Sequence, residues 1–573
     1  MIVDFLHPSA LVEVDVDLCI VGAGPAGIAI ARSFIGTSVS VCVLESGGLD
    51  VEDGSQALYE GTSGGTLPLD PATCRIRAFG GSGNVWGGGC IPLGSSDLDH
   101  REWVPHSGWP VTYAELELYY LRALAYCGIK GHAFSPGSFD TLPARPPPAF
   151  DARILANQNF ILSPLFFGEA YREELRRAAN ISVVLHANLL ELEADETGTS
   201  VRAARIGSLD GRRGVVRARN YVLACGGIEN ARLLLMSDSV APGGLGNERD
   251  LVGRFFMDHP SGKLGMLASK DADRICRPYN RTGGKGPTPA FPELCISDHA
   301  TKEQRILAAR VRPVAVEGPV PAGIAALREF RTALRKPSRD EALEGQMAAR
   351  AVGEAGGGQV MTPGLGKLAL RLGQGIGDVA HAVGRKRAGE PVVGTDHIDV
   401  VGFFEQAPNR DSRITLGRGT DALGQRKVCV DWRLTPLDWH TYRVVAQIAG
   451  GELARACRAR FQPAPWLEPG SGIVPPLRGT SHHLGTTRMS DDPATGVVDR
   501  HCKVHGIDNL YVVGSSVFPA AGWAFPTFTI VALSLRLAER LRTCLKQRPI
   551  EEGFQPRDTA TASSQARKVS CAT

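Results

Sequence analysis

Apolar runs separated by a glycine-rich turn dominate the first fifty residues. The segment Asp17–Val21 is largely apolar and continuous, a pattern typical of a buried strand. The run Ile28–Phe34, after the glycine turn, predicts a helix. A second apolar run, Val39–Leu44, predicts another buried strand and ends at Glu45. The order strand, turn, helix, strand indicates a βαβ unit with parallel strands.

Similar patterns return later in the chain. The residues Tyr113–Tyr126 have the spacing of an amphipathic helix. Strand-like runs fill residues 180–235, and the last of them, Tyr221–Ala224, precedes a glycine turn and a helix that starts near Glu229. Because this repeats the first motif without its full glycine spacing, we expect distant segments to return to one nucleotide-binding sheet.

The character of the sequence changes between about residues 260 and 475. The stretch Lys302–Arg387 is helix-rich and punctuated by glycine and proline, and two alternating strand-like runs follow, His397–Gly417 and Lys427–Leu434. We interpret this region as an inserted second domain, a sheet with helices on one side. The polar, aperiodic residues 549–573 predict a disordered tail.

Composition narrows the class of protein. With 573 residues, 43% apolar and 21% charged, the chain has the make-up of a globular enzyme with at least two cores. A formal net charge of +3 gives no electrostatic case for nucleic-acid binding. Basic clusters such as Arg328–Arg339 and Gly384–Arg387 are more typical of solvated helix faces.

The cysteines and the N-terminus bear on the compartment. The thirteen cysteines are an odd, scattered set without a CxxC pair, which argues against a disulfide framework and a structural zinc site, so we expect no metal. The N-terminus lacks the features of a signal peptide, and no apolar stretch approaches the ~18 residues of a membrane span. We expect a cytoplasmic protein without a transmembrane segment.

The glycine turn has the spacing of a dinucleotide site. Gly22 permits the tight turn, Gly24 lets the backbone approach a pyrophosphate, and Gly27 allows close contact between helix and strand. The helix N-terminus supplies N–H donors and the positive end of the helix dipole. Glu45 follows Gly27 at the distance expected for a carboxylate that binds a ribose diol. This motif alone leaves FAD and NAD open.

A second glycine cluster runs from Arg77 to Leu93 around Trp86. So much glycine beside one indole suggests backbone lying close against a large flat ligand. The alternative is a flexible surface loop, which rarely carries a tryptophan and an apolar exit.

These segments together resemble the glucose-methanol-choline oxidoreductases, a family of FAD-dependent alcohol oxidases and dehydrogenases. The resemblance spans nearly the whole chain outside roughly residues 271–392. The matching segments are Asp17–Gly48, Arg77–Pro110, Tyr221–Leu235, Val252–Pro260, Glu405–Leu416 and Ser481–Leu541.

The resemblance implies a mixed α/β fold: a Rossmann-type FAD-binding domain built from discontinuous segments, capped by the inserted substrate-binding domain. The expected divisions are FAD-binding residues 1–110, 180–260 and 476–548, a connecting or lid segment 111–179, and a cap 261–475. FAD is expected to be non-covalent, because Val85 stands where some members carry a histidine that binds the flavin covalently.

The resemblance also assigns cofactor contacts by position, from the ADP half of FAD through the pyrophosphate to the pyrimidine end of the flavin. Gly514 stands where several members have an aspartate. The expected contacts are Gly22, Gly24, Pro25, Ala26, Gly27, Glu45, Ser46, Arg77, Gly80, Gly81, Asn84, Val85, Trp86, Gly87, Leu189, Ala224, Gly226, Gly514, Ser515, Pro526 and Thr527.

The catalytic base implied by the resemblance is His482, three residues before Gly485 in an H-x-x-G-T pattern. A neutral imidazole would accept the substrate hydroxyl proton while the hydrogen on carbon leaves as hydride to flavin N5. An unperturbed pKa of ~6.5 keeps much of an imidazole neutral near pH 7. The adjacent His483 is expected to pack or to bond the Thr486–Thr487 turn, with a role as reserve base as the alternative.

Phe525 departs from the family pattern, which places a histidine or asparagine at this point in the active site. A phenyl ring cannot donate to a developing alkoxide, a loss of about 1–3 kcal/mol. Three interpretations follow: His483 or another donor substitutes, Phe525 packs a bulky or apolar substrate, or the protein has left alcohol oxidation.

The sequence therefore predicts an FAD-dependent oxidoreductase of CH–OH groups in a sugar, polyol or other alcohol natural product. Oxygen and another electron acceptor both stay open. The alternatives are a flavoenzyme of the same fold with lyase, isomerase or desaturase chemistry, and an FAD-binding protein whose catalysis has decayed.

Overall fold

The tertiary structure is a computed structural model that describes residues 1–8, 10, 12–130, 148–269, 275, 276, 279, 290–334, 365–387 and 392–547. The expected disordered tail, residues 549–573, lies outside the described residues. Within these ranges no helix is both long and apolar enough to cross a membrane.

The larger sheet gathers strands from both ends of the chain. Its eight strands have the order β1–β7–β3–β2–β10–β9–β8, with β18 beside β10. Strands β1, β7, β3, β2, β10 and β18 are mutually parallel, and β9 runs antiparallel to its two neighbours, β10 and β8. The bounds are β1 Ile2–Asp4, β2 Glu13–Val21, β3 Val41–Leu44, β7 Ile181–Leu185, β8 Asn188–Ala194, β9 Val201–Gly207, β10 Arg213–Leu223 and β18 Leu510–Val512.

The predicted βαβ unit is present with shifted bounds: β2 and α1 are longer than the patterns indicated, and β3 is shorter. Helix α1, Pro25–Ser33, begins three residues before the apolar run, because Pro25 is favourable in the first turn and Gly24 is the N-cap. Helix α6, Gly226–Met236, likewise begins before the expected Glu229. The predicted helix Tyr113–Tyr126 is α4, and Thr112 and Glu115 form its capping box.

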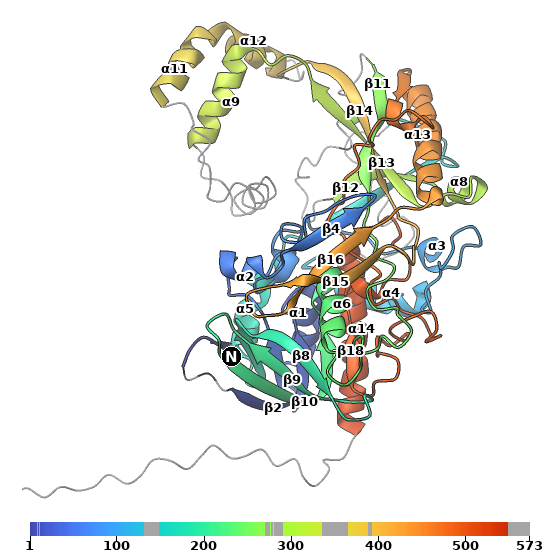
Figure 1. Ribbon diagram of the computed structural model, residues 1–573. Coiled ribbons are helices and arrows are strands. Elements are labelled where there is room, and N and C mark those ends of the chain that lie inside the picture. The colour runs from blue at the N-terminus through green and yellow to red at the C-terminus, as the bar shows by residue number, and fades with distance from the viewer. Residues whose placement is uncertain are drawn as a thin grey trace, which may run out of the picture.

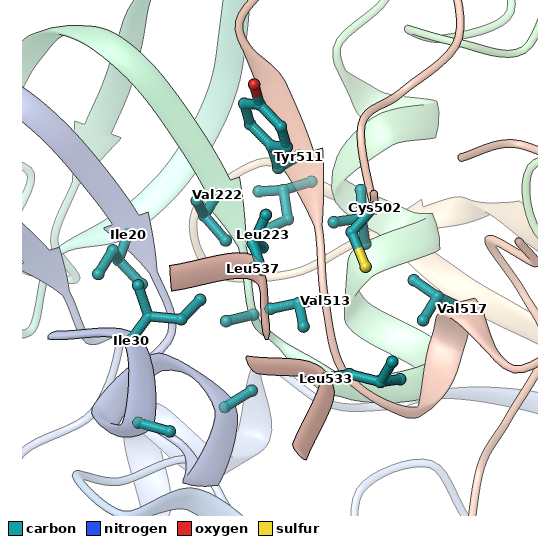
Figure 2. Packing of buried hydrophobic residues seen from close by; sticks show 14 of the residues in the cluster. Ile20, Ile30, Val222, Leu223, Cys502, Tyr511, Val513, Val517, Leu533 and Leu537 are labelled. Carbon is teal, nitrogen blue, oxygen red and sulfur yellow. The ribbon is translucent and has the colours of Figure 1, made fainter. Parts of the chain in front are cut away.

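The core of this domain lies where helices pack on the parallel strands. Helix α14, Pro526–Gln547, packs against α1 and α4, and α5, Phe167–Arg177, packs against α1 and β7. Figure 2 shows Ile20 of β2, Val222 of β10, Ile30 of α1 and Leu533 of α14 within one cluster of buried hydrophobic residues. All four side chains are buried. Burial of such side chains at about 25 cal/mol per Å² of apolar surface is the main force that assembles the sheet from distant segments.

A second sheet forms the other half of the molecule (Figure 1). Its order is β17–β11–β14–β13–β12–β6–β5, and helix α13, Pro436–Cys457, packs against β17, β11 and β14. The bounds are β5 Gly89–Cys90, β6 Leu155–Leu162, β11 Ser261–Ala268, β12 Ala290–Ile296, β13 Ala309–Glu317, β14 Thr395–Phe404 and β17 Arg460–Pro463.

Two features differ from the sequence expectation. Strand β13 lies inside the stretch Lys302–Arg387 that was expected to be helix-rich, since its charged Arg310 and Arg312 interrupt the apolar strand pattern. Strands β5 and β6 join this sheet from outside the expected cap, residues 261–475. The described helices at or within this stretch lie away from the large sheet (Figure 1). They are α8 Asp298–Glu303, α9 Ala322–Leu334, α11 Leu365–Gln374 and α12 Ile376–Arg387.

A small sheet and a buried ion pair join the two halves. Strands β15, Arg413–Thr420, and β16, Arg426–Trp432, pair with β4, Gly61–Gly65. Glu405, at the end of β14, is fully buried and bonds both Nη atoms of Arg101 at 2.7 and 2.5 Å. Its carboxylate also accepts the N–H of Gly522 at 3.3 Å, three residues before Phe525.

Candidate active site

The carboxyl ends of β2, β3, β10 and β18 meet at one edge of the large sheet, and a cavity of about 620 Å³ opens there. Ligand sites in proteins typically have about 300–1,000 Å³ and lie at this edge of a doubly wound sheet. The wall includes most residues expected at the cofactor site. They are Gly22, Gly24, Pro25, Ala26, Glu45, Ser46, Arg77, Gly81, Val85, Trp86, Gly87, Leu189, Ala224, Gly226, Gly514, Ser515, Pro526 and Thr527.

Three expected contacts lie behind the wall. A Cβ on Gly27 would come within 1.9 Å of the Gly22 carbonyl oxygen, so this glycine serves the packing of α1 on β2. Gly80 has a φ of 98°, and the Asn84 Nδ2 donates to the Phe79 carbonyl at 2.8 Å. Gly80 and Asn84 therefore shape the turn beneath the cavity.

The turn between β2 and α1 has the properties of an anion site. Gly22 adopts a φ of 99°, and a Cβ on Gly24 would meet no protein atom within 4 Å. No side chain caps the N-terminus of α1. Its first N–H groups are therefore available to a phosphate group on the cavity side.

Glu45 ends β3 at the same edge. Its buried carboxylate accepts the backbone N–H groups of Ala23 at 3.0 Å and Gly47 at 2.9 Å. Burial raises the pKa of Glu45, and these N–H groups and Arg77 oppose the rise. The carboxylate is held rigidly beside the glycine turn and lines the cavity.

A buried charge cluster that the sequence analysis missed lies along the cavity. Glu229, in the first turn of α6, bonds Arg75 at 2.9 Å, Arg77 at 3.1 Å and Arg232 at 3.0 Å. Burial opposes ionisation of Glu229, but Arg232, Arg77 and Arg75 outweigh burial and hold its pKa at about 2. Among the described residues, the buried Arg75 Nη2 and Arg77 Nε have no hydrogen-bond partner.

The glycine-tryptophan loop passes along the same cavity. The Trp86 Nε1 donates to the Leu165 carbonyl at 2.9 Å, and the indole stacks on Phe167 with centroids 4.8 Å apart. The loop is therefore anchored, as expected for ligand contact and not for a flexible surface loop. Val85, beside it, has no ring nitrogen that could form a covalent bond to a flavin.

His482 lies at the far end of the cavity, on the loop before Gly485. Its Nδ1 is 2.9 Å from the Thr480 Oγ1 and 3.1 Å from the His259 Nδ1. Thr480 can donate its own proton to the His259 carbonyl at 3.1 Å. We therefore assign the proton of His482 to Nδ1, which leaves the Nε2 lone pair as its basic site.

Asp258 organises the backbone that carries His482. Its fully buried carboxylate accepts the N–H groups of His259 at 2.6 Å, His482 at 2.9 Å and Ser481 at 3.1 Å. Ser481 has a φ of 62°, an unfavourable conformation for a residue with a Cβ, so this turn needs such support. Burial raises the pKa of Asp258 to about 6, against the effect of the backbone donors.

Burial keeps the three histidines of the site neutral. It lowers the pKa of His482 well below 6.5, and the charges of His259, Arg310 and His483 act in the same direction. Burial and the charge of Arg310 lower the pKa of His259 to about 4. A neutral imidazole is the form that accepts a proton.

His483 lines the cavity and packs, the first of its two expected roles, without a bond to the Thr486–Thr487 turn. Its ring stacks on Phe256, with centroids 5.8 Å apart. The hydroxyls of Thr486 and Thr487 bond Gly227 and Ser516 instead of His483. Burial and Arg75 lower the pKa of His483 to about 3, and among the described residues its buried Nε2 has no partner.

Phe525 lines the cavity beside His482, with ring centroids 5.4 Å apart. Its ring also lies 4.6 Å from that of Phe160. A Cβ on Gly89 would come within 2.7 Å of the Phe525 ring. The phenyl ring therefore fills this corner against β5 and β6.

Strand β13 contributes two arginines that the sequence analysis missed. Arg310 and Arg312 are two residues apart on the strand, so their side chains point to the same face of the sheet. Both line the cavity. Both pair with the fully buried Glu293 of β12, Arg310 at 2.9 Å. The period-2 spacing was the signal, but the helix-rich surroundings concealed it.

The residues fit an FAD molecule on three counts. Gly24 and Gly226 line the cavity, and a Cβ on either would meet no protein atom within 4 Å, so side chains there would occupy the cavity. An uncapped helix N-terminus faces the expected pyrophosphate. Arg75, Arg77 and His483 line the cavity, and these side chains can donate hydrogen bonds to a polar ligand.

Comparisons with known proteins agree with this fit. Residues 408–534 match the family model described as GMC oxidoreductase. The chain is 25% identical to the 6'''-hydroxyparomomycin C oxidase of Streptomyces lividus, covering 92% of each chain. It is also 25% identical to the paromamine 6'-oxidase of Streptomyces fradiae, covering 91% of this chain and 90% of the relative.

Solved structures share the fold. The pyridoxine 4-oxidase from Mesorbium loti superimposes with a TM-score of 0.52 at 16% identity, covering 92% of this chain and 99% of that chain. The matched family region contains Phe525 and the loop of His482, and the two relatives match nearly the full length. Residues 408–534 therefore carry a region described as GMC oxidoreductase, and the chain is an FAD-dependent oxidoreductase that acts on CH–OH donors.

Proposed function

We propose that the protein oxidises a CH–OH group of a sugar or related alcohol natural product, with His482 as general base. The observation that carries this proposal is the neutral His482 ring, whose Nδ1 is occupied by Thr480 and His259 while the ring lines the cavity. Its Nε2 is then the atom that accepts the substrate hydroxyl proton. When bound, FAD supplies the hydride acceptor.

The other residues of the site hold His482 in position and exclude water from its surroundings. Asp258 fixes the His482 backbone, and Thr480 orients the ring so that Nε2 keeps its lone pair. Phe525 and Phe403 line the cavity near the base and exclude water there. A desolvated site strengthens each hydrogen bond to the substrate oxygen.

The substrate class is supported by the relatives. The two Streptomyces proteins are named as oxidases of paromamine and of a hydroxyparomomycin, which are sugar derivatives. Their similarity extends over nine-tenths of this chain, so it includes the cavity wall from both domains. We infer a sugar-like alcohol for this chain, with FAD bound non-covalently.

Anaerobic mixing with a panel of sugars, polyols and small alcohols tests the proposal. We expect at least one class to bleach the oxidised-flavin absorbance of the purified yellow protein. His482→Ala should lower the rate constant of this reduction by roughly 10²-fold or more while FAD stays bound. A panel without any bleaching, or an unchanged rate in His482→Ala, contradicts the proposal.

A further inference from the structure

We propose that Arg310 is the hydrogen-bond donor to the reacting substrate oxygen, the role that Phe525 cannot fill. This inference rests on the proposed function, because it concerns the same hydroxyl that His482 deprotonates. It assigns a second catalytic side chain to strand β13 of the substrate domain, outside the C-terminal motif that carries His482 and Phe525.

The geometry places Arg310 next to the base. Its guanidinium carbon lies 4.6 Å from the centre of the Phe525 ring, and the His482 ring lies 5.4 Å from the same ring. All three side chains line the cavity. The charge of Arg310 lowers the pKa of both His482 and His259, as expected for a cation this close. Arg310 and His482 therefore both adjoin Phe525 at the cavity, and the proposal places the reacting hydroxyl between them.

The surroundings hold the guanidinium in place. Arg310 is 3% exposed, pairs with Glu293 at 2.9 Å and lies 4.0 Å over the Phe403 ring. Glu293, fully buried, is shared with Arg312. An arginine so ordered loses little side-chain entropy when it binds substrate. Phe403 and Phe525 face the same guanidinium and exclude water around it.

The chemistry agrees with this placement. In the proposed reaction the hydroxyl proton passes to His482 Nε2, a C=O bond forms, and the hydrogen on carbon leaves together with its electron pair as a hydride that FAD would accept. Negative charge develops on the substrate oxygen as the proton leaves. An N–H of Arg310 stabilises this charge and remains bonded to its own nitrogen throughout, so no proton is lost from the arginine.

The test compares Arg310→Met and Arg310→Lys with the unaltered enzyme loaded with FAD. Hydride transfer, followed anaerobically as flavin bleaching by a substrate from the panel, should slow about 10- to 100-fold in Arg310→Met and less in Arg310→Lys. In Arg310→Ala, added guanidinium ion should restore part of the rate. Full activity of Arg310→Met in a folded, FAD-bound protein overturns the inference.

A second readout does not depend on turnover. Acetate carries a charged oxygen pair that imitates the developing alkoxide, and its binding can be followed through the flavin absorbance spectrum. We expect acetate to bind at least about tenfold more weakly to Arg310→Met. Equal affinity in the two proteins contradicts a donor at this position.

Phe525→Asn makes the test specific. An amide at this position supplies the missing donor, so it should accelerate flavin reduction more in the Arg310→Met background than in the unaltered enzyme. Such coupling is the mark of two groups that serve one oxygen. Equal effects in both backgrounds mean that Arg310 acts elsewhere.

Arg312→Met is the matched comparison, because Arg312 shares Glu293 and the same wall but is 5.8 Å from Phe403. Its rate should fall less than that of Arg310→Met, and equal falls overturn the inference. Failure of this inference is distinct from failure of the proposed function. If flavin reduction is slow in His482→Ala but unchanged in Arg310→Met, only the role of the arginine is rejected. If flavin reduction is unchanged in His482→Ala, the role of His482 as base is rejected.

Discussion

His482 illustrates how neighbouring atoms select the function of a side chain. Two polar atoms, from Thr480 and His259, meet its Nδ1, while burial disfavours the imidazolium. The result is a neutral ring with one defined basic nitrogen. His483, the adjacent residue, is buried against Phe256, and burial and Arg75 lower its pKa to about 3, so its ring is neutral as well.

The pH dependence of flavin reduction follows from this burial. A base whose pKa is lowered stays unprotonated to lower pH, so the rate constant should be flat near pH 7 and fall only well below pH 6.5. Stopped-flow reduction between pH 4.5 and 8 checks this, taken as about the range of histidine titration. His482→Ala should lose the acidic decline, and an inflection above pH 6.5 would show that another group controls the rate.

The attachment of FAD also depends on one residue. Because Val85 lines the cavity without a nucleophilic nitrogen, acid or heat denaturation should release the flavin into the supernatant. The measurement is the flavin fluorescence of the soluble fraction after precipitation. Colour that stays with the pelleted protein contradicts this prediction.

At the scale of the element, the loop 480–482 depends on the segment between the large sheet and β11. Asp258 accepts several of the loop's N–H groups, and Ser481 occupies a left-handed conformation. Similarly, Glu405 holds both Arg101 and the backbone of Gly522, which leads to Phe525. Buried carboxylates outside the cavity thus position both sides of the reaction centre.

Asp258→Asn tests this support. An amide nitrogen in place of one carboxylate oxygen leaves a buried backbone donor without an acceptor, at a cost of about 1–3 kcal/mol. We expect a lower melting temperature and slower flavin reduction, with FAD still bound. Asp421→Asn is the comparison, because Asp421 is also buried and paired, with Arg232, but lies away from His482. Slowing of similar size in both variants would mean a general loss of stability.

At the scale of the whole molecule, the substrate meets a wall of positive charge from β13. Arg310 and Arg312 share one carboxylate, Glu293, at the cavity. Coulomb repulsion in a poorly solvated cavity disfavours an ammonium group there. Among glucose, glucuronate and glucosamine, we therefore expect glucosamine to have the lowest kcat/KM for flavin reduction, with a difference that narrows in high salt. A higher kcat/KM for glucosamine than for the other two sugars would contradict the proposed repulsion by Arg310 and Arg312.

Much of the cofactor half was predictable because its signals are local. The glycines from Gly22 to Gly27, the helix after them and Glu45 at the next strand end all lie within one βαβ unit. Strand and helix bounds shifted by a few residues, since Pro25 and Gly226 can begin a helix before the apolar run begins. Residues of this unit reach the cavity as the sequence analysis expected.

The substrate half was not predictable in the same way. Arg75, Glu229 and Arg310 are separated by long stretches of chain, and their roles follow from buried partners that no local pattern reveals. Strand β13 was hidden by its charged residues, and β5 and β6 joined the second sheet from outside the expected cap.

The sequence by itself predicted the nucleotide turn and the acidic residue beside it, because their spacing is local to one βαβ unit, whereas His482 and Phe525 were singled out by the resemblance to a family. Only the tertiary structure decided which nitrogen of His482 is basic and which cation stands beside Phe525. The physical reason is that hydrogen bonds and burial in this site join segments hundreds of residues apart, so their energies depend on the assembled sheets and not on neighbours in the chain.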